Sequence, residues 1–286
     1  MIVSVRDLRY RYSRSAIDVL NGFDFDIGEG EIFGFLGPNG SGKSTTQKVL
    51  TRILPDYGGT VQIFGKTLAD RSADFYNRIG VSFEFPNLYE KLTAEENLEF
   101  YGGFFDVPTI DPETLLRSLD LPVGDRRSVA MFSKGMKMRL VLARSLINRP
   151  KLWFLDEPTT GQDPQHAAAI RDLIRAQADG GVTVFLTTHD MTLADRLCDR
   201  VALIDEGRLL VVDTPRALKL GFNQHAVRVE NRVPDGSLQR HEFRLDDAVS
   251  KHAFLQAVRT TDVETIHTLE PSLEDVFLRL TGKGLV

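Results

Sequence analysis

The sequence lacks the usual features of a secreted or membrane-embedded protein. It has one cysteine, Cys198, so an intramolecular disulfide is impossible; a reducing compartment is expected, with this thiol packed as a small buried side chain. Its apolar runs, such as 152–155 and 182–186, are far shorter than the ~20 residues that a transmembrane helix needs. The first ten residues mix charged and apolar side chains and contain no apolar stretch typical of a signal peptide. We therefore expect a cytoplasmic chain that would need a partner for any membrane role.

Positive charge is also scarce. The 35 Lys and Arg residues are outnumbered by 40 Asp and Glu residues, which gives a net charge of −5, whereas proteins that bind DNA or RNA generally carry a basic footprint. The sequence contains no low-complexity tract and no internal repeat. With 42% hydrophobic and 26% charged residues, it has the composition of a globular protein with one large core, or one core and a small appendage.

Hydrophobic periodicity and turn residues predict alternating strands and helices. Strands are expected at 23–27, 31–36, 60–64, 152–155, 182–187, 201–204 and 208–212, and helices at 44–54, within the mostly helical stretch 85–148, and at 165–178. Met136, Leu140, Ala143 and Ile147 recur at helical spacing and share one helix face. Several strands are apolar throughout, as is typical of strands buried on both faces of a parallel sheet. We therefore expect an α/β fold with a mostly parallel sheet covered by helices.

The pattern changes near residue 221, just after a helix that Thr214 and Pro215 are expected to start. The elements predicted beyond it are polar strands at 225–230 and 239–244, a turn between them at 234–237, a helix, a strand at 264–269, and a last helix capped by Ser272. We therefore predict a main domain of residues 1–220 and a small α+β accessory domain of residues 221–286.

A glycine-rich loop lies between the strand at 31–36 and the helix at 44–54. This phosphate loop fits the pattern G-x-x-x-x-G-K-[ST] and consists of Gly37, Pro38, Asn39, Gly40, Ser41, Gly42, Lys43 and Ser44. Its backbone N–H groups can curve around an anion, and the helix N-terminus adds a favourable dipole. Lys43 can neutralise the β and γ phosphates, the Ser44 hydroxyl can ligate Mg²⁺, and Thr45 can hydrogen-bond the α or β phosphate. This context predicts nucleoside triphosphate binding over the alternative of a simple turn with a solvated lysine.

The apolar strand at 152–155 leads directly into two carboxylates, Asp156 and Glu157. An unpaired charge at the end of a buried strand is costly unless a cation or a ligand lies there. Asp156 suits Mg²⁺, and Glu157 points in another direction and can accept a proton from an attacking water. By themselves the two residues could simply cap the following turn, but together with the phosphate loop they indicate hydrolysis of a nucleoside triphosphate.

Further segments, in their order and spacing, resemble ATP-binding cassette (ABC) proteins. The signature segment, residues 132–136 with the sequence Phe-Ser-Lys-Gly-Met, resembles the family's usual Leu-Ser-Gly-Gly-Gln. The Asp163 loop, residues 160–163, resembles the D-loop, residues 79–84 resemble the Q-loop, and His189 follows a buried strand as the family's switch histidine does. The resemblance covers residues 1 to about 220. It implies a cassette with a mostly parallel core, an antiparallel β subdomain and a helical subdomain at about 85–150.

The resemblance also implies roles that the spacing alone does not assign. Ser133 and the Gly135 N–H would contact the γ-phosphate held by a second cassette, so that two ATP molecules lie between two cassettes arranged head to tail. Asp163 would belong to the nucleotide-binding residues, and His189 would contact the γ-phosphate and position Glu157 with its water. His189 is thus expected to be functional, although a lone histidine is more often structural.

Two further positions are implied at the edges of the nucleotide site. Tyr12 stands where the family has the aromatic that stacks on adenine, but Tyr10 is close by, and a half-buried strand tyrosine is the alternative. Glu84 stands where most members have a glutamine; its carboxylate could still bind Mg²⁺ or hold a water.

Three other departures from the family pattern are Lys134 for the first signature glycine, Met136 for the signature glutamine, and Gln162 for a common leucine. None of the departures removes a group that the chemistry requires. A hydrolytically competent ATPase with ATP and Mg²⁺ as cofactors is therefore expected.

The branch of the family is indicated by two more segments. Residues 86–98 resemble the part of transporter cassettes that meets the permease, and residues 271–282 resemble the C-terminal tail of cassettes that serve ABC-2 type exporters. The hypothesis is a motor subunit that exports a substrate through a separate permease, on the cytoplasmic face of the membrane. One alternative is a cassette ATPase acting on nucleic acid or the ribosome, which would be expected to show two cassettes, a long coiled coil or a basic linker. Another is a regulatory module that holds ATP without turnover.

Overall fold

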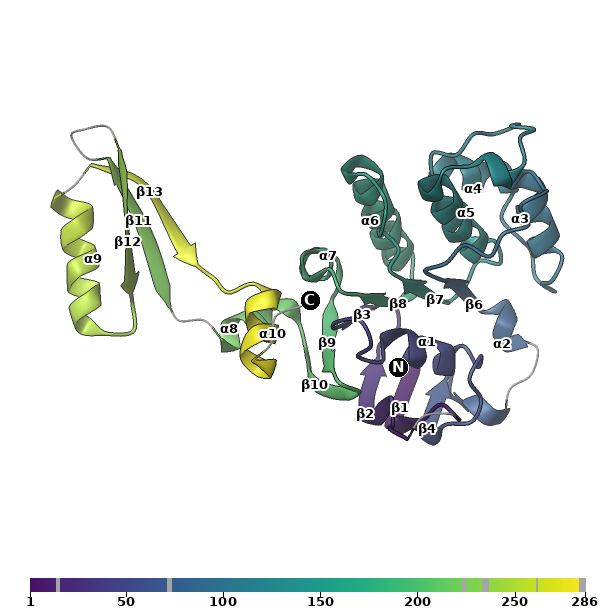
Figure 1. Ribbon diagram of the computed structural model, residues 1–286, viewed down its shortest axis with the longest axis horizontal. Helices are drawn as coiled ribbons and strands as arrows, with labels where there is room; N and C mark the ends of the chain where they lie inside the picture. Colours follow the sequence, from purple (N-terminus) through teal and green to yellow (C-terminus); the bar gives the residue numbers. More distant parts are fainter. Residues whose placement is uncertain (14–15, 71–73, 223–224, 233–236, 261, 283–286) are drawn as a thin grey trace. The chain divides into compact units, whose positions relative to one another are not determined.

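The computed structural model describes residues 1–13, 16–70, 74–222, 225–232, 237–260 and 262–282 (Figure 1). Residues 234–236 of the predicted turn lie outside this described part. The chain divides into two compact units, Met1–Asp213 and Thr214–Gly284.

The first unit contains the elements expected of an α/β domain. They are β1 Val3–Tyr10, β2 Leu20–Ile27, β3 Ile32–Leu36, α1 Lys43–Leu50, β4 Gly58–Ile63, β5 Lys66–Thr67, η1 Leu68–Asp70, α2 Asp74–Asn77, β6 Ile79–Ser82, α3 Ala94–Gly102, α4 Pro112–Ser118, η2 Val129–Met131, α5 Lys134–Leu146, β7 Leu152–Asp156, α6 Pro164–Asp179, β8 Thr183–Thr188, α7 Met191–Leu197, β9 Arg200–Asp205 and β10 Arg208–Asp213.

A six-stranded sheet with the order β10-β9-β3-β8-β7-β6 forms the centre of this unit. Strands β9, β3, β8, β7 and β6 are parallel, and β10 returns antiparallel to β9, which confirms the predicted hairpin. Every residue of β3, β7 and β8 is buried, as their continuous apolar sequences predicted. The carboxyl ends of these three strands share one edge of the sheet, and the loops that leave this edge carry the candidate site.

A second sheet, with the order β2-β1-β4-β5, is antiparallel. The alternation in β2 buries Phe23, Phe25 and Ile27, while the intervening Asp24 and Asp26 turn away from the core. Phe25 stacks on Phe33 of the central sheet, with ring centroids 5.6 Å apart. Aromatic packing therefore joins the two sheets and holds β3, which leads into the phosphate loop.

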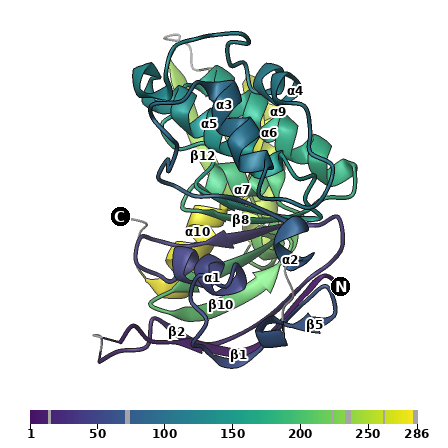
Figure 2. The same cartoon turned by 90° about the vertical axis from the view of Figure 1, so that its right-hand side faces the viewer.

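The predicted helical stretch forms α3, α4 and α5, which pack against one another (Figure 2). Helix α5 begins at Lys134 because the Ser133 hydroxyl accepts a hydrogen bond from the Met136 N–H at 3.2 Å. From Met138 onward the helix is buried on all sides, so its apolar surface is wider than the single predicted face. The signature segment thus begins a helix that is fixed by the packing of its second half.

The second unit contains α8 Pro215–Gly221, β11 Ala226–Arg232, β12 Leu238–Arg244, α9 Ala248–Thr260, β13 Val263–Leu269 and α10 Leu273–Thr281. Its three strands form an antiparallel sheet in the order β12-β11-β13. Phe254 of α9 packs against Phe243 of β12, with ring centroids 6.0 Å apart. Ser272 caps α10 in a capping box with Asp275, as expected.

The boundary between the units lies earlier than the sequence indicated. The second unit begins at Thr214, whereas the predicted boundary was at residue 221. The reason is that α8 packs against α10, and Arg279 of α10 donates a hydrogen bond to the Phe222 carbonyl at 2.5 Å. A helix that looks like the end of the first domain in the sequence therefore belongs to the second unit.

Two expectations about apolar features can be compared with the described residues. No helix in the described ranges is both long enough and apolar enough to span a bilayer. Cys198 is buried, and its burial raises the pKa of the thiol, so it packs as a small apolar side chain as predicted.

Candidate functional site

The phosphate loop connects β3 to α1 at the carboxyl edge of the central sheet. Two of its glycines are required by geometry. Gly42 has φ 112°, which is strained for other residues, and a Cβ there would lie 2.7 Å from Leu20 Cδ2. A Cβ on Gly37 would lie 2.2 Å from the Ile204 carbonyl oxygen. The loop can therefore keep its curved backbone only with glycine at these positions.

Lys43 is buried and turns back into the phosphate loop. Its Nζ donates to the Gly37 carbonyl at 2.6 Å and to the Pro38 carbonyl at 3.0 Å. Burial lowers the pKa of Lys43, while the nearby carboxylates, Glu157 foremost, act in the opposite direction. The ammonium group is thus held inside the phosphate loop by two backbone carbonyls, and a bound anion could take their place.

A cleft of about 390 Å³ lies over this loop. It is lined by Tyr12, Val19, Asn39, Gly40, Gly42, Lys43, Ser44, Thr45, Glu84, Asp156, Glu157, Thr160 and His189. Most of the predicted site residues therefore meet in one place. Gly37, Pro38 and Ser41 belong to the same loop but do not line the cleft; the carbonyls of the first two hold Lys43 instead.

A larger hollow of about 840 Å³ in the first unit contains none of the predicted site residues. Arg78, Arg149 and Lys151 line it near the carboxyl end of α5. Cations at that position offset the negative end of a helix dipole, which accounts for them without a ligand.

Asp156 ends β7 beside the phosphate loop. Its Oδ1 accepts a hydrogen bond from the Ser44 hydroxyl at 3.3 Å and another from the Thr187 hydroxyl. Burial raises the pKa of the Asp156 carboxyl, and the bonds from Thr187 and Ser44 oppose this rise. The half-buried Glu84 follows β6 and lines the same cleft. Oxygen donors from three segments thus surround the part of the cleft next to Ser44.

Glu157 is only 7% exposed and is held by four hydrogen-bond donors. Its Oε1 lies 2.7 Å from His189 Nδ1 and accepts the His189 N–H at 2.9 Å. Its Oε2 accepts the Thr188 hydroxyl at 2.9 Å and the Thr160 hydroxyl at 3.3 Å. The backbone at Glu157 has φ 50°, in the left-handed region that few non-glycine residues adopt. The carboxylate is therefore oriented by its surroundings before any ligand binds.

Three threonines were missed by the sequence reasoning. Thr187 contacts Asp156, and Thr188 and Thr160 contact Glu157. The first two lie at the end of β8, where Thr187 pairs with Asp156 across the sheet. The signal in the sequence is a pair of threonines at the end of a buried strand. It could be interpreted only once β8 was known to pair with β7, which ends in the carboxylates.

Tyr12 lies two residues beyond the end of β1 and lines the cleft. Its hydroxyl is 3.2 Å from Thr45 Oγ1, and its ring makes an edge contact with Tyr10 at 5.0 Å between centroids. Tyr10 is the residue within the strand, so the strand alternative describes Tyr10 and not Tyr12.

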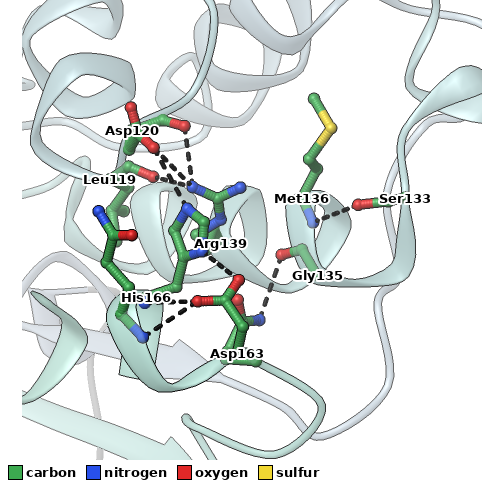
Figure 3. A network of polar contacts seen from close by, with 10 residues as sticks. Leu119, Asp120, Ser133, Gly135, Met136, Arg139, Asp163 and His166 are labelled. Atoms are coloured by element: carbon green, nitrogen blue, oxygen red, sulfur yellow. Dashed lines mark hydrogen bonds and ion pairs between the residues drawn. The ribbon is translucent and has the colours of Figure 1, made fainter. Parts of the chain in front are cut away.

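Ser133, Gly135 and Asp163 do not line this cleft. They lie together elsewhere on the first unit, because Gln162 Nε2 donates to the Gly135 carbonyl at 3.2 Å (Figure 3). Asp163 caps α6 by accepting the N–H groups of Gln165 at 3.1 Å and His166 at 3.0 Å. The predicted residues thus form two groups within one chain.

Comparisons with known proteins agree with this geometry. Residues 20–160 match the family described as "ABC transporter", and residues 225–270 match a "Fluoroquinolone efflux ABC transporter C-terminal domain". A protein named "Fluoroquinolones export ATP-binding protein" from Mycobacterium tuberculosis is 48% identical over 99% of this chain and 94% of its own length. A daunorubicin resistance ATP-binding protein from Streptomyces coeruleorubidus is 37% identical over 92% of this chain and 90% of its own length.

Solved structures show the same fold. An ATP-binding subunit of an ABC transporter matches with a TM-score of 0.70 and 30% identity, covering 78% of this chain and 93% of that chain. A dimeric ATP-binding cassette in a post-hydrolysis state, bound to ADP and Pi, matches with a TM-score of 0.67 and 25% identity, covering 74% of this chain and 98% of that one.

The phosphate loop, the paired carboxylates and these matches show that the chain belongs to the ABC transporter family. It is an ATP-binding, ATP-hydrolysing subunit of an ABC transporter. The names of its relatives support transport and give no support to action on nucleic acid.

Proposed function

We propose that this chain is the motor subunit of an exporter and drives a separate transmembrane permease from the cytoplasmic face of the membrane. The observation that carries the ATPase part is the cleft in which Lys43 lies in the phosphate loop next to Asp156 and the Glu157–His189 pair. Export is supported by the 48% identity, over 99% of the chain, to a fluoroquinolones export ATP-binding protein.

The phosphate loop and its neighbours are proposed to bind ATP. Lys43 would leave the Gly37 and Pro38 carbonyls and contact the β and γ phosphates, while the backbone of residues 37–42 and the Ser44 and Thr45 hydroxyls surround them. Tyr12 would stack on the adenine, since it is 38% exposed at the edge of the cleft. Its contact with Thr45 would have to open for this purpose.

The residues at the cleft also fit Mg²⁺. Ser44 Oγ and Asp156 Oδ1 lie 3.3 Å apart, and Glu84 lines the same cleft. Mg²⁺ prefers a few protein oxygens together with phosphate oxygens and waters. No cluster of three or more His, Cys, Asp or Glu side chains suited to a metal occurs in the described residues, so phosphates would complete the coordination. A bound Mg²⁺ would neutralise charge on the phosphates.

Hydrolysis is proposed to start from a water held by Glu157. The carboxylate takes a proton from that water, whose oxygen forms a bond to the γ-phosphorus as the bond to the ADP oxygen breaks. His189 holds Glu157 through Oε1 and lines the cleft, where it would also contact the γ-phosphate. This pair weighs against a module that holds ATP without turnover.

Ser133, Gly135 and Asp163 are proposed to complete the site of a second cassette. They lie away from the cleft of their own chain, at the start of α5 and in the loop before α6. Two chains placed head to tail would each supply these groups to the ATP of the other, which makes a composite site. The dimeric cassette bound to ADP and Pi supports such an arrangement.

The permease is proposed to dock on an aromatic cluster of the helical region. Phe85, Tyr89, Phe100 and Phe104 are 74%, 51%, 48% and 64% exposed, and the last three rings touch at 4.8 Å and 5.2 Å between centroids. Exposed aromatic surface of this kind marks a protein interaction site.

Sequence neighbours of this aromatic cluster contact α5, the helix that the signature segment begins. Buried Arg144 of α5 donates to the Asn87 carbonyl at 2.7 Å and lies 4.9 Å from the Tyr101 ring. A movement of the docked permease can therefore reach α5 through Asn87.

The test is a pull-down of the tagged chain from detergent-solubilised membranes, followed by ATPase assays. We expect a polytopic membrane protein in a one-to-one ratio, with a higher ATPase rate in the complex and further stimulation by a fluoroquinolone. A matched variant with Phe100 and Phe104 changed to serine should keep basal ATPase activity and lose the membrane protein. Recovery of ribosomes or nucleic acid with no membrane protein would overturn the transport proposal.

A further inference from the structure

Gln162 stands where the family commonly has a leucine, and its amide makes a contact that a leucine cannot make. Its Nε2 donates to the Gly135 carbonyl at 3.2 Å, so the Asp163 loop is bonded to the first turn of α5 (Figure 3). A Cβ on Gly135 would lie 3.4 Å from Gln162 Oε1, which shows how closely the two segments approach. This contact joins the Asp163 loop to the signature segment, and Ser133, Gly135 and Asp163 of these segments do not line the cleft of their own chain.

His166 forms a second connection, which runs from the Asp163 loop to α5 at a point beyond the signature segment. Its Nδ1 lies 2.5 Å from Asp163 Oδ2, and its Nε2 lies 3.2 Å from Asp120 Oδ2. Arg139 of α5 in turn donates to the Asp120 carbonyl at 2.8 Å and to the Leu119 carbonyl at 3.0 Å (Figure 3). The connection therefore runs from Asp163 through His166 and Asp120 to the buried guanidinium of α5.

These contacts can restrain the Asp163 loop although they are not part of the hydrophobic core. The side chains of Asp163, His166 and Asp120 are 57%, 25% and 85% exposed. Asp163 is also the cap of α6, so the His166 ring holds a carboxylate whose other oxygen is already bonded to the helix. Exposed hydrogen bonds of this kind are individually weak, and two of them acting on one loop fix its position better than either one.

We propose that Gln162 and His166 are positioning residues that tether the Asp163 loop to the signature segment and to α5, the helix that this segment begins in the same chain. The two segments then approach the second cassette as one pre-arranged surface. Because less freedom is lost when a surface is already ordered, the tether favours assembly of the composite site. This inference rests on the composite site proposed above, and neither residue is assigned a contact with the nucleotide.

The test uses the full chain with its co-purified membrane partner and the double variant Gln162→Leu/His166→Ala. Gln165→Leu is the matched control, since Gln165 is exposed on the same turn and its side chain takes no part in the tether. Four quantities are measured: amide hydrogen exchange of residues 133–139 and 159–166, the kcat and KM for ATP, the affinity for ADP, and the Tm. ADP affinity reports the chain's own cleft without closure of two cassettes.

The tether predicts faster exchange in both segments and a KM for ATP raised about three- to tenfold in the double variant, which corresponds to the loss of roughly one hydrogen bond. ADP affinity and Tm should match those of the control. Unchanged exchange and kinetics would overturn the inference, and so would a parallel fall in Tm, ADP affinity and activity, which indicates a merely structural role. If the unmodified complex itself shows no ATP turnover, the proposed function fails, while the exchange measurement still decides whether the tether exists.

Discussion

Thr188→Val is the change that most directly tests how the candidate base is held. Thr188 is 1% exposed, and its hydroxyl donates to Glu157 Oε2 at 2.9 Å. Valine has nearly the same shape, so the substitution removes the donor to Glu157 together with the acceptor of the Asp190 N–H, which lies 3.0 Å from the hydroxyl oxygen. A hydrogen bond to a charged group contributes about 1.5–3 kcal/mol. If that amount orients Glu157 during hydrolysis, kcat should fall about ten- to hundredfold.

The assay compares kcat, KM and ADP affinity of purified variants. ADP affinity should not change, because Thr188 does not line the cleft. Thr183→Val is the matched control: Thr183 is a buried threonine of the same strand, and its hydroxyl accepts the Gly30 N–H at 2.9 Å at the other end of β8. Thr188→Ser should restore most of the rate because it keeps the hydroxyl. A Thr188→Val enzyme that turns over within twofold of the wild-type rate would refute the reasoning.

The remaining predictions concern the carboxylates and the composite site. Glu157→Gln should bind ATP and accumulate as a trapped dimer on size exclusion while losing turnover; wild-type hydrolysis by this variant would contradict its role as base. Asp156→Asn should lose Mg²⁺-dependent ATPase activity but raise the Tm of the nucleotide-free chain. Burial raises the pKa of Asp156 above its ordinary value of about 3.9. Ionising the buried carboxyl therefore costs stability as the pH rises above about 4. Asparagine does not ionise, so the Tm gain of the variant should grow with pH from that point. A Tm gain that is the same at every pH would contradict this assignment. Mixing Ser133→Ala with Lys43→Ala chains should recover ATPase activity through one intact site per heterodimer; no recovery would count against sites shared between chains.

Much of the fold was predictable because the signals are local. The alternation of Phe23, Phe25 and Ile27 with aspartates predicted a half-buried strand, and β2 buries these three residues. The apolar run at 152–155 predicted a strand buried on both faces, and β7 is buried throughout. Periodicity and burial agree here because the spacing of apolar residues along a strand indicates which of its faces are buried.

The division of the chain was less predictable. Helix α8 has the length and capping of an ordinary domain-ending helix, and Thr214 caps it by accepting the Ala217 N–H at 3.0 Å. Nothing local shows that it packs against α10, more than fifty residues later in the sequence. The sequence pattern therefore predicts a boundary at residue 221, whereas the second unit begins at Thr214.

The chemical groups of the candidate site follow from local sequence. The spacing of glycines before Lys43 and Ser44, and the two carboxylates after a buried strand, specify a phosphate cup and its acidic edge, because consecutive residues set the backbone geometry there. The side chains that hold these groups in position are specified by the packing of distant segments. Strand register places Thr187 next to Asp156, and loop packing brings Gln162 to the Gly135 carbonyl. Such contacts join residues distant in the chain, and their partners depend on how strands and helices pack rather than on any local pattern.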